Sequence, residues 1–295
     1  MTLHAGAAPR RPSGRRRTAV AYVAFTLAVL ALSAAAARAE TLLERGAYLM
    51  RGIVACGNCH TPQGPEGPLP GMEMAGGLPF EFEAFTAYSS NLTPDVETGL
   101  GGWSDAEIIT AIREGRRPDG SIIGPIMPIA LYRNMSDRDV QAIVAYLRSL
   151  KPVRNAVQKS VYRMPLPPNY GPPVGSVAEV SPDDTLAYGA YLAGPLGHCI
   201  ECHSPVGPNG GPDWENQLGA GGFEFPGPWG VSVSPNITPA GLGDWSDADI
   251  KRAITEGVRP DGRLLMPPMP FGYYKNVSAQ DLDALVAYLR SLPAK

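Results

Sequence analysis

The stretch Cys56-Gly57-Asn58-Cys59-His60 decides how the chain is organised, because it returns as Cys199-Ile200-Glu201-Cys202-His203, 143 residues later (199 minus 56). Further landmarks follow in the same order in both halves. These are Asn91 to Pro94 with Asn236 to Pro239, Trp103 to Asp105 with Trp245 to Asp247, and Val144 to Leu150 with Val286 to Leu292. A repeat of this length is far longer than a solenoid unit, so the sequence predicts two tandem domains that arose by duplication.

Two cysteines separated by two residues and followed directly by histidine form the attachment pattern for c-type haem. The sequence therefore predicts two covalently bound haem c groups and their iron. The candidate attachment residues are Cys56, Cys59, Cys199 and Cys202, and the candidate proximal iron ligands are His60 and His203. Zinc binding and a disulfide are the alternatives for a CxxC pair. Zinc would need cysteines from both repeats or further ligands, and a disulfide gives no reason for the His after each pair.

The second axial ligand of such an iron is commonly a methionine, and it too should repeat. Met127-Pro128 corresponds to Met269-Pro270, 142 residues later (269 minus 127). Met127 and Met269 are thus the candidate axial ligands. Met266 competes with Met269 because it also precedes a proline, although its counterpart in the first repeat is Gly124.

The remaining histidines supply almost no other ligand. His4 lies in the N-terminal segment, and His198 is too close to Cys199 to reach the opposite face of the haem. All four cysteines are used in attachment, so a thiolate-ligated haem is disfavoured as well.

Repeated Trp and Asn side chains have two interpretations. The favoured one is a core aromatic and a turn. The other is that they meet the haem propionates together with nearby arginines, which would neutralise partly buried charge. The residues concerned are Trp103, Trp245, Asn91, Asn236, Arg116, Arg117 and Arg259.

The N-terminus has the three parts of a secretory signal: a basic stretch at Arg15 to Arg17, an apolar run from about Ala19 to Ala37, and the small-residue pattern Ala37-Arg38-Ala39. Export to the periplasm with cleavage before Glu40 is the expectation. The alternative is an uncleaved segment that attaches the protein to the inner membrane.

Residues 1–39 hold six arginines and no acidic residue, so the remainder carries 19 minus 28, or −9. A nucleic-acid partner is therefore disfavoured, and a partner with a basic docking patch is the natural complement.

We divide the chain into a signal peptide at 1–39, a first domain at 40–151, a proline-rich linker at 152–184 and a second domain at 185–295. The linker is expected to be extended and semi-rigid. Apolar residues at helical spacing follow Ser136 and Ser278, shorter helices precede each Cys motif, and a third helix in each half is expected to end near Gly115 or Gly257. No convincing alternating strand stands out, so the expected class is all-α.

These motifs together resemble the class I cytochrome c fold, and more closely the cytochrome c subunits of periplasmic alcohol, aldehyde and gluconate dehydrogenases. The resemblance rests on the CxxCH motifs, the Asn-Leu/Ile-Thr-Pro loops, the Gly-Leu-Gly-x-Trp-Ser-Asp segments, Arg-Pro-Asp-Gly, Met-Pro and the terminal helices. It implies that the N-terminal helix of each domain crosses the C-terminal one, with Gly46 against the helix that bears Tyr146 and Gly189 against the helix that bears Tyr288. Many subunits of that family carry three haem motifs, whereas this sequence has two.

The expected function is electron transfer without catalysis, with a periplasmic dehydrogenase as donor and a cytochrome or terminal oxidase of the respiratory chain as acceptor. A diheme peroxidase is the first alternative, although it needs an acid/base group beside an open haem. A diheme subunit of a terminal oxidase is the second.

Overall fold

The computed structural model describes residues 1–2, 6, 39–208, 210–227 and 229–295. The predicted signal peptide therefore lies almost wholly outside the described residues. Residues Thr41–Lys295 form one compact unit that contains both repeats. Its helices are α2 (Leu42–Arg51), α3 (Gly57–His60), α4 (Asp105–Glu114), α5 (Ile129–Tyr132), α6 (Asp137–Ser149), α7 (Thr185–Tyr191), the π-helix η1 (Leu192–Leu196), α8 (Cys199–Cys202), α9 (Pro239–Leu242), α10 (Asp247–Glu256), α11 (Phe271–Tyr274) and α12 (Ala279–Ser291).

The long helices begin and end where the sequence predicts. Ser104 caps α4 through a reciprocal pair of hydrogen bonds with Glu107, and Ser246 caps α10 in the same way with Asp249. Gly115 and Gly257 then end these helices with φ values of 63° and 69°, which glycine adopts without strain. The two repeats therefore fold by the same local signals.

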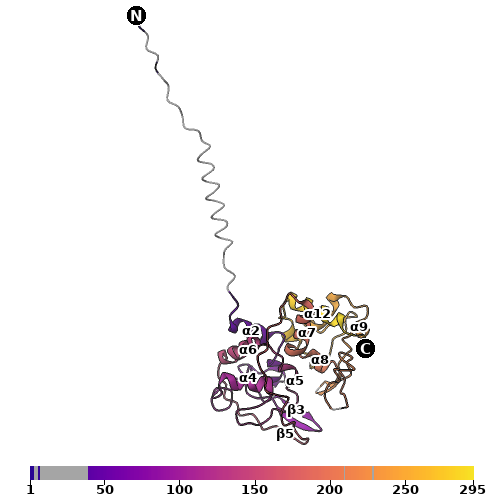
Figure 1. The fold of residues 1–295 in the computed structure, drawn as a ribbon. Helices are drawn as coiled ribbons and strands as arrows, with labels where there is room; N and C mark the ends of the chain where they lie inside the picture. The colour runs from indigo at the N-terminus through magenta and orange to yellow at the C-terminus, as the bar shows by residue number, and fades with distance from the viewer. Residues whose placement is uncertain (3–5, 7–38, 209, 228) are drawn as a thin grey trace. The chain divides into compact units, whose positions relative to one another are not determined.

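The first and last helices of each repeat cross at a glycine, as the resemblance implies. α2 lies against α6 and α7 lies against α12 (Figure 1). A Cβ at Gly46 would clash with the carbonyl oxygen of Ala142 and lie 3.0 Å from the Tyr146 Cβ. At Gly189 the same clash would occur with Ala284 and Tyr288. Only glycine allows the two backbones to approach this closely.

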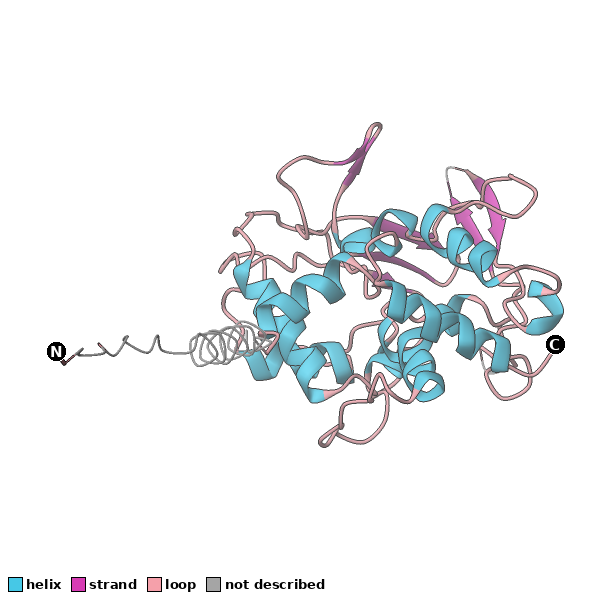
Figure 2. Ribbon diagram, turned by 90° about the horizontal axis from the view of Figure 1, so that it is seen from above, coloured by secondary structure: helices cyan, strands magenta, loops and turns pink. Residues whose placement is uncertain are grey.

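The expectation of an all-α protein is wrong, because antiparallel strands occur in both repeats (Figure 2). The strands are β1 (Gln63–Gly64), β2 (Gly67–Pro68), β3 (Pro79–Phe82), β4 (Phe85–Tyr88), β5 (Val161–Tyr162), β6 (Glu224–Gly227) and β7 (Gly230–Val233). They form the pair β1-β2, the sheet β3-β4-β5 and the pair β6-β7. Each strand is at most four residues long, so its alternation is too short to stand out from a loop.

The linker lies along the first repeat. Its strand β5 pairs with β4, and the Tyr170 hydroxyl farther along donates to the Ile123 carbonyl at 2.8 Å. The Val177 amide then donates to the Asp137 carboxylate at 3.2 Å. We call residues 152–184 the strap, since these bonds fasten the segment to the surface of the first repeat.

Two crossed tyrosines link the repeats. The Tyr48 hydroxyl of α2 donates to Asp281 at 2.6 Å and accepts from the Ser278 amide at 3.0 Å, so it completes the cap of α12 in the other repeat. Tyr191 of α7 does the same at α6, with bonds of 2.7 Å to Asp139 and 3.0 Å from the Ser136 amide. One apolar core runs through both repeats. The chain from Thr41 is thus built as a pseudo-symmetric pair.

Within the part of the chain that the structure describes, no helix is both long and apolar enough to cross a membrane.

Candidate haem centres

The two CxxCH motifs form matching short helical turns. Cys56 precedes α3, and Cys199 begins α8. All four cysteines are half-buried. Two thiols on one turn, three residues apart, lie on the same side of it and suit covalent attachment of one planar group.

The histidine of each turn is held through one ring nitrogen. Nδ1 of His60 lies 2.8 Å from the Ser90 carbonyl oxygen, and Nδ1 of His203 lies 2.7 Å from that of Pro235. A carbonyl oxygen accepts a hydrogen bond but cannot donate one. Nδ1 of each neutral imidazole therefore carries the hydrogen, and Nε2 keeps a lone pair for a metal. Burial lowers the pKa of both imidazoles, which keeps them neutral as an iron ligand must be. These features fit a proximal ligand.

A structural zinc ion is held by four Cys, His or carboxylate ligands. Among the described residues, one group of three His, Cys, Asp or Glu atoms lies close enough to share an ion, namely His198, Glu201 and Cys202. It contains neither CxxCH histidine, and Cys202 belongs to the attachment turn.

The candidate methionines differ in exposure. Met127 and Met269 are partly buried and pack against the core that runs through both repeats. Met266, the competitor of Met269, has 48% of its surface exposed. Met127 and Met269 thus lie in matching surroundings in the two repeats, and Met266 does not.

Each attachment turn touches the other repeat. The Asn58 amide in the first turn donates to the Pro268 carbonyl at 3.3 Å, beside Met269. His198, directly before the second turn, packs edge-on against the Tyr132 ring with centroids 6.0 Å apart. The sequence analysis only excludes His198 as a ligand on the opposite face of the haem. It misses this contact because the counterpart of His198 is Ala55 and no repeated pattern marks it.

The repeated asparagines complete turns, as the favoured interpretation predicts. The Asn91 side-chain oxygen accepts from the amide and the hydroxyl of Thr93, at 3.0 and 2.8 Å. Asn236 bonds Thr238 in the same way, at 2.8 and 2.7 Å. The Asn91 Nδ2 donates to the Val153 carbonyl at 2.8 Å and the Asn236 Nδ2 donates to the Lys295 carbonyl at 2.7 Å, so the amide donors that a propionate would need already have partners.

Arg117 and Arg259, two of the arginines considered as partners of the haem propionates, differ in their surroundings. Arg117 donates to the Ile122 carbonyl at 3.1 Å, so it serves its own turn. Arg259 lies over the Trp245 ring, 5.3 Å from its centroid, and its buried Nε has no hydrogen-bond partner among the described residues, although Asp261 lies 4.0 Å away. Arg259 thus keeps a buried donor that would suit a carboxylate of the haem.

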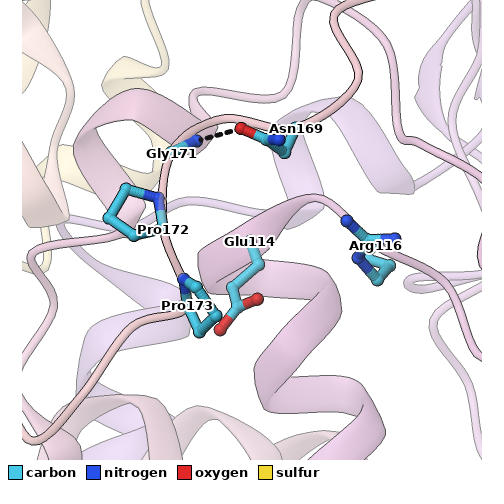
Figure 3. Close-up of a pocket in the computed structure, with 6 residues that line it drawn as sticks. All are labelled: Glu114, Arg116, Asn169, Gly171, Pro172 and Pro173. Carbon is cyan, nitrogen blue, oxygen red and sulfur yellow. Dashed lines mark hydrogen bonds between the residues drawn. The ribbon is translucent and has the colours of Figure 1, made fainter.

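A hollow of about 350 Å³ lies away from both turns, where the strap passes the end of α4 (Figure 3). Its lining residues are Glu114, Arg116, Asn169, Gly171, Pro172 and Pro173. Glu114 already accepts a bond of 2.9 Å from the Val174 amide. The hollow thus belongs to the fastening of the strap, and Arg116 lies there.

Two CxxCH turns, each with a neutral His fixed at Nδ1 and a half-buried Met in a repeated loop, define a c-type cytochrome. Comparisons with known proteins agree. Residues 43–151 match the family model of cytochrome c, and residues 187–289 match that of cytochrome c oxidase, cbb3-type, subunit III.

The chain is 31% identical over 252 residues to a protein of Cereibacter sphaeroides named "Diheme cytochrome c-type", covering 81% of this chain and 82% of that protein. It therefore belongs to the diheme c-type cytochromes and carries two covalently bound haem c groups. It is also 33% identical over 301 residues to the cytochrome c subunit of alcohol dehydrogenase (quinone) of Gluconobacter oxydans, and 31% identical over 301 residues to the gluconate 2-dehydrogenase cytochrome c subunit of Pantoea cypripedii. The chain spans 60% and 66% of the length of these two relatives.

Proposed function

We propose that this protein carries single electrons from a periplasmic dehydrogenase subunit to a cytochrome or terminal oxidase of the respiratory chain, and that it has no catalytic site of its own. The observation that carries the proposal is the ligand inventory of the two centres. Each has one His with a free Nε2 and one Met in the matching loop. A haem with both axial positions filled exchanges electrons and does not bind substrate. Two of the relatives above are named as cytochrome c subunits of dehydrogenases.

The roles that follow for individual residues are these. Cys56 and Cys59 hold the first haem and Cys199 and Cys202 the second. His60 and His203 bind iron through Nε2, with Met127 and Met269 on the opposite sides. Bound haem iron supplies a one-electron couple, and the protein tunes it through burial and hydrogen bonding.

The contacts of each attachment turn with the other repeat support exchange within the chain. Asn58 of the first turn reaches Pro268 of the second repeat, and His198 reaches Tyr132 of the first. We infer that an electron entering one haem passes to the other without leaving the molecule.

The division of the chain is part of the same proposal. Residues 1–39 direct export and are removed before Glu40, 40–151 and 185–295 are the two haem domains, and 152–184 is the strap. An uncleaved N-terminus would instead attach the protein to the inner membrane, and sequencing the N-terminus of the purified protein distinguishes the two outcomes.

The axial assignment predicts a specific spectroscopic change. A ferric haem with Met–iron bonding has a weak charge-transfer band near the red edge of the visible spectrum. Met127→Ala and Met269→Ala should each remove about half of this band, since each deletes one of two ligands, and should lower the potential of one haem. Met266→Ala is the matched control and should keep the full band.

The opposite result, a band lost in Met266→Ala and kept in Met269→Ala, would contradict the assignment. Substantial turnover of hydrogen peroxide by the purified diheme protein would overturn the electron carrier in favour of an enzyme.

A further inference from the structure

In each repeat, a strand edge and the loop before the candidate axial methionine form one surface. The strap covers this surface in the first repeat, and the surface is exposed in the second. In the first repeat the strap covers the edge of β4 and the loop before Met127 together. Tyr162 of β5 pairs with Phe85 of β4, and its ring occupies the space where a Cβ on Gly124 would lie. One side chain thus touches both elements, so the strand edge and the methionine loop form a single surface.

In the second repeat β7 replaces β4, and Met266 replaces Gly124. The replacement is fixed by Ser234 and Asn236, which match Ser89 and Asn91. Among the described residues β7 pairs only with β6. The apolar side chains on this surface are largely exposed: Val231 60%, Val233 55%, Leu264 74% and Met266 48%. We call these four residues the second-repeat edge.

An unpaired strand with exposed apolar side chains is a template for another strand. We propose that the second-repeat edge is the docking site for an extended, basic segment of the dehydrogenase subunit, which adds to β7 as a third strand beside the Met269 loop. The inference rests on the proposed function for the identity of the partner. It assigns the second haem as the one that meets the dehydrogenase.

The strap shows which chemistry this kind of surface accepts. Its pairing segment is Lys159-Ser160-Val161-Tyr162-Arg163, a short strand flanked by cations. Arg163 donates to the carbonyls of Glu83 and Phe82 at the β3-β4 turn, at 2.7 and 2.6 Å. Beside these side-chain bonds, the backbone of β5 pairs with Phe85 and Thr86 of β4. Strand addition takes its affinity from such main-chain pairing and its specificity from the side chains between the paired positions.

Charge favours a basic occupant on the second repeat even more. No Lys or Arg occurs between Arg163 and Lys251, a stretch that contains the whole β6-β7 pair. Beyond the strap, the acidic residues in that stretch are Glu201, Asp213, Glu215, Glu224, Asp244, Asp247 and Asp249, of which Asp247 is paired with Arg290 at 3.2 Å. The one cation adjoining the second-repeat edge in sequence, Arg263, is paired with Asp261 at 2.7 Å.

The second-repeat edge also has room for a large side chain. Phe85, which packs against Tyr162 with ring centroids 6.1 Å apart, is replaced by Gly230. Nothing lies within 4 Å of the position that a Cβ on Gly230 would take. An aromatic residue of the partner therefore has space at this point of β7.

The test uses the full holo-protein in its diamagnetic ferrous state and a synthetic peptide with the sequence of residues 157–165 as the probe. The peptide should shift the amide resonances of Val231, Val233 and Met266. In the variant Val231→Lys/Val233→Lys the dissociation constant should rise at least about tenfold, because lysines on a strand edge oppose pairing and repel a basic strand. Val96→Lys alters an equally exposed valine of the first repeat and should bind the peptide like wild type.

Two outcomes would overturn the proposal. One is a wild-type protein whose β7 resonances do not move at millimolar peptide. The other is a dimer in sedimentation that dissociates in Val231→Lys/Val233→Lys, since a second copy would then be the occupant. Peptide binding needs no electron transfer, whereas the proposed function fails if the haems are not reduced by a dehydrogenase, so the two failures are distinguishable.

Discussion

Single glycines set the distance between the helices that frame each haem centre. Gly46→Ala and Gly189→Ala should each lower the free energy of unfolding by about 3 kcal/mol, because the new methyl group meets a backbone carbonyl that cannot rotate away. Gly272→Ala is the control, since nothing lies within 4 Å of its Cβ position. Denaturant titration of the ferric protein measures all three. Equal midpoints for Gly46→Ala and Gly272→Ala would show that the crossing tolerates a side chain.

At this scale, residues that act through local spacing are predictable and residues that act through contacts are not. The cysteines and the histidine of each CxxCH motif lie on one turn. They are therefore adjacent in the sequence and form a motif that can be recognised there. Met127 and Met269 follow from repetition. His198 gains its surroundings from Tyr132, which is distant in sequence, and nothing near His198 signals the contact.

Among the elements, the 174–177 end of the strap is held by two carboxylates, Glu114 and Asp137, of which Asp137 has a clearly shifted pKa. Hydrogen bonds from the Ser176 hydroxyl, Arg113 and the Val177 amide lower the pKa of Asp137 from 3.8 to about 2. A depressed folded-state pKa stabilises the folded form above the unfolded pKa, and the contribution disappears as the pH falls from about 4 to about 2. The strap should therefore loosen at its 174–177 end over this interval.

Hydrogen exchange at the Val177 amide between pH 5 and 2 measures this loosening. Protection should fall in wild type, whereas Asp137→Asn should show weaker protection throughout and little further change, because its side chain does not titrate. Protection in Asp137→Asn that follows the wild-type curve would assign the acid effect to another group.

Elements were predictable in proportion to their length. The helices from Asp105, Asp137, Asp247 and Ala279 are ten to thirteen residues long and have their own capping residues. The spacing of their apolar residues and their capping residues therefore predict the same helices. The strands are stabilised by partners elsewhere in the chain, and β5 forms only because the strap meets β4. Short strands whose pairing is non-local leave almost no periodic signal, which is why the all-α prediction failed.

For the whole molecule, the crossed tyrosines determine whether the two haem domains move as one body. The two links have the same pattern of hydrogen bonds, but the carboxylates of Asp139 and Asp281 differ in their other partners. Asp139 also receives a bidentate pair from Arg45, with bonds of 2.7 and 3.2 Å. Asp281, 6% exposed, has Tyr48 as its only side-chain partner among the described residues, because Tyr188 stands where Arg45 stands in the first repeat.

Removing a partner from a buried carboxylate costs more when nothing else pairs with that carboxylate. Tyr48→Phe should therefore lower the free energy of unfolding by about 3 kcal/mol, and Tyr191→Phe by about 1 kcal/mol. Tyr88→Phe, whose hydroxyl makes no hydrogen bond among the described residues, is the control and should change it by less than about 0.5 kcal/mol. Adding Asp281→Asn to Tyr48→Phe should recover part of the loss, since a neutral amide is less costly to bury than an unpaired charge. If Tyr191→Phe lowers the free energy of unfolding as much as Tyr48→Phe does, Arg45 does not compensate Asp139 for the lost hydrogen bond. The two links would then be equivalent in energy as well as in geometry.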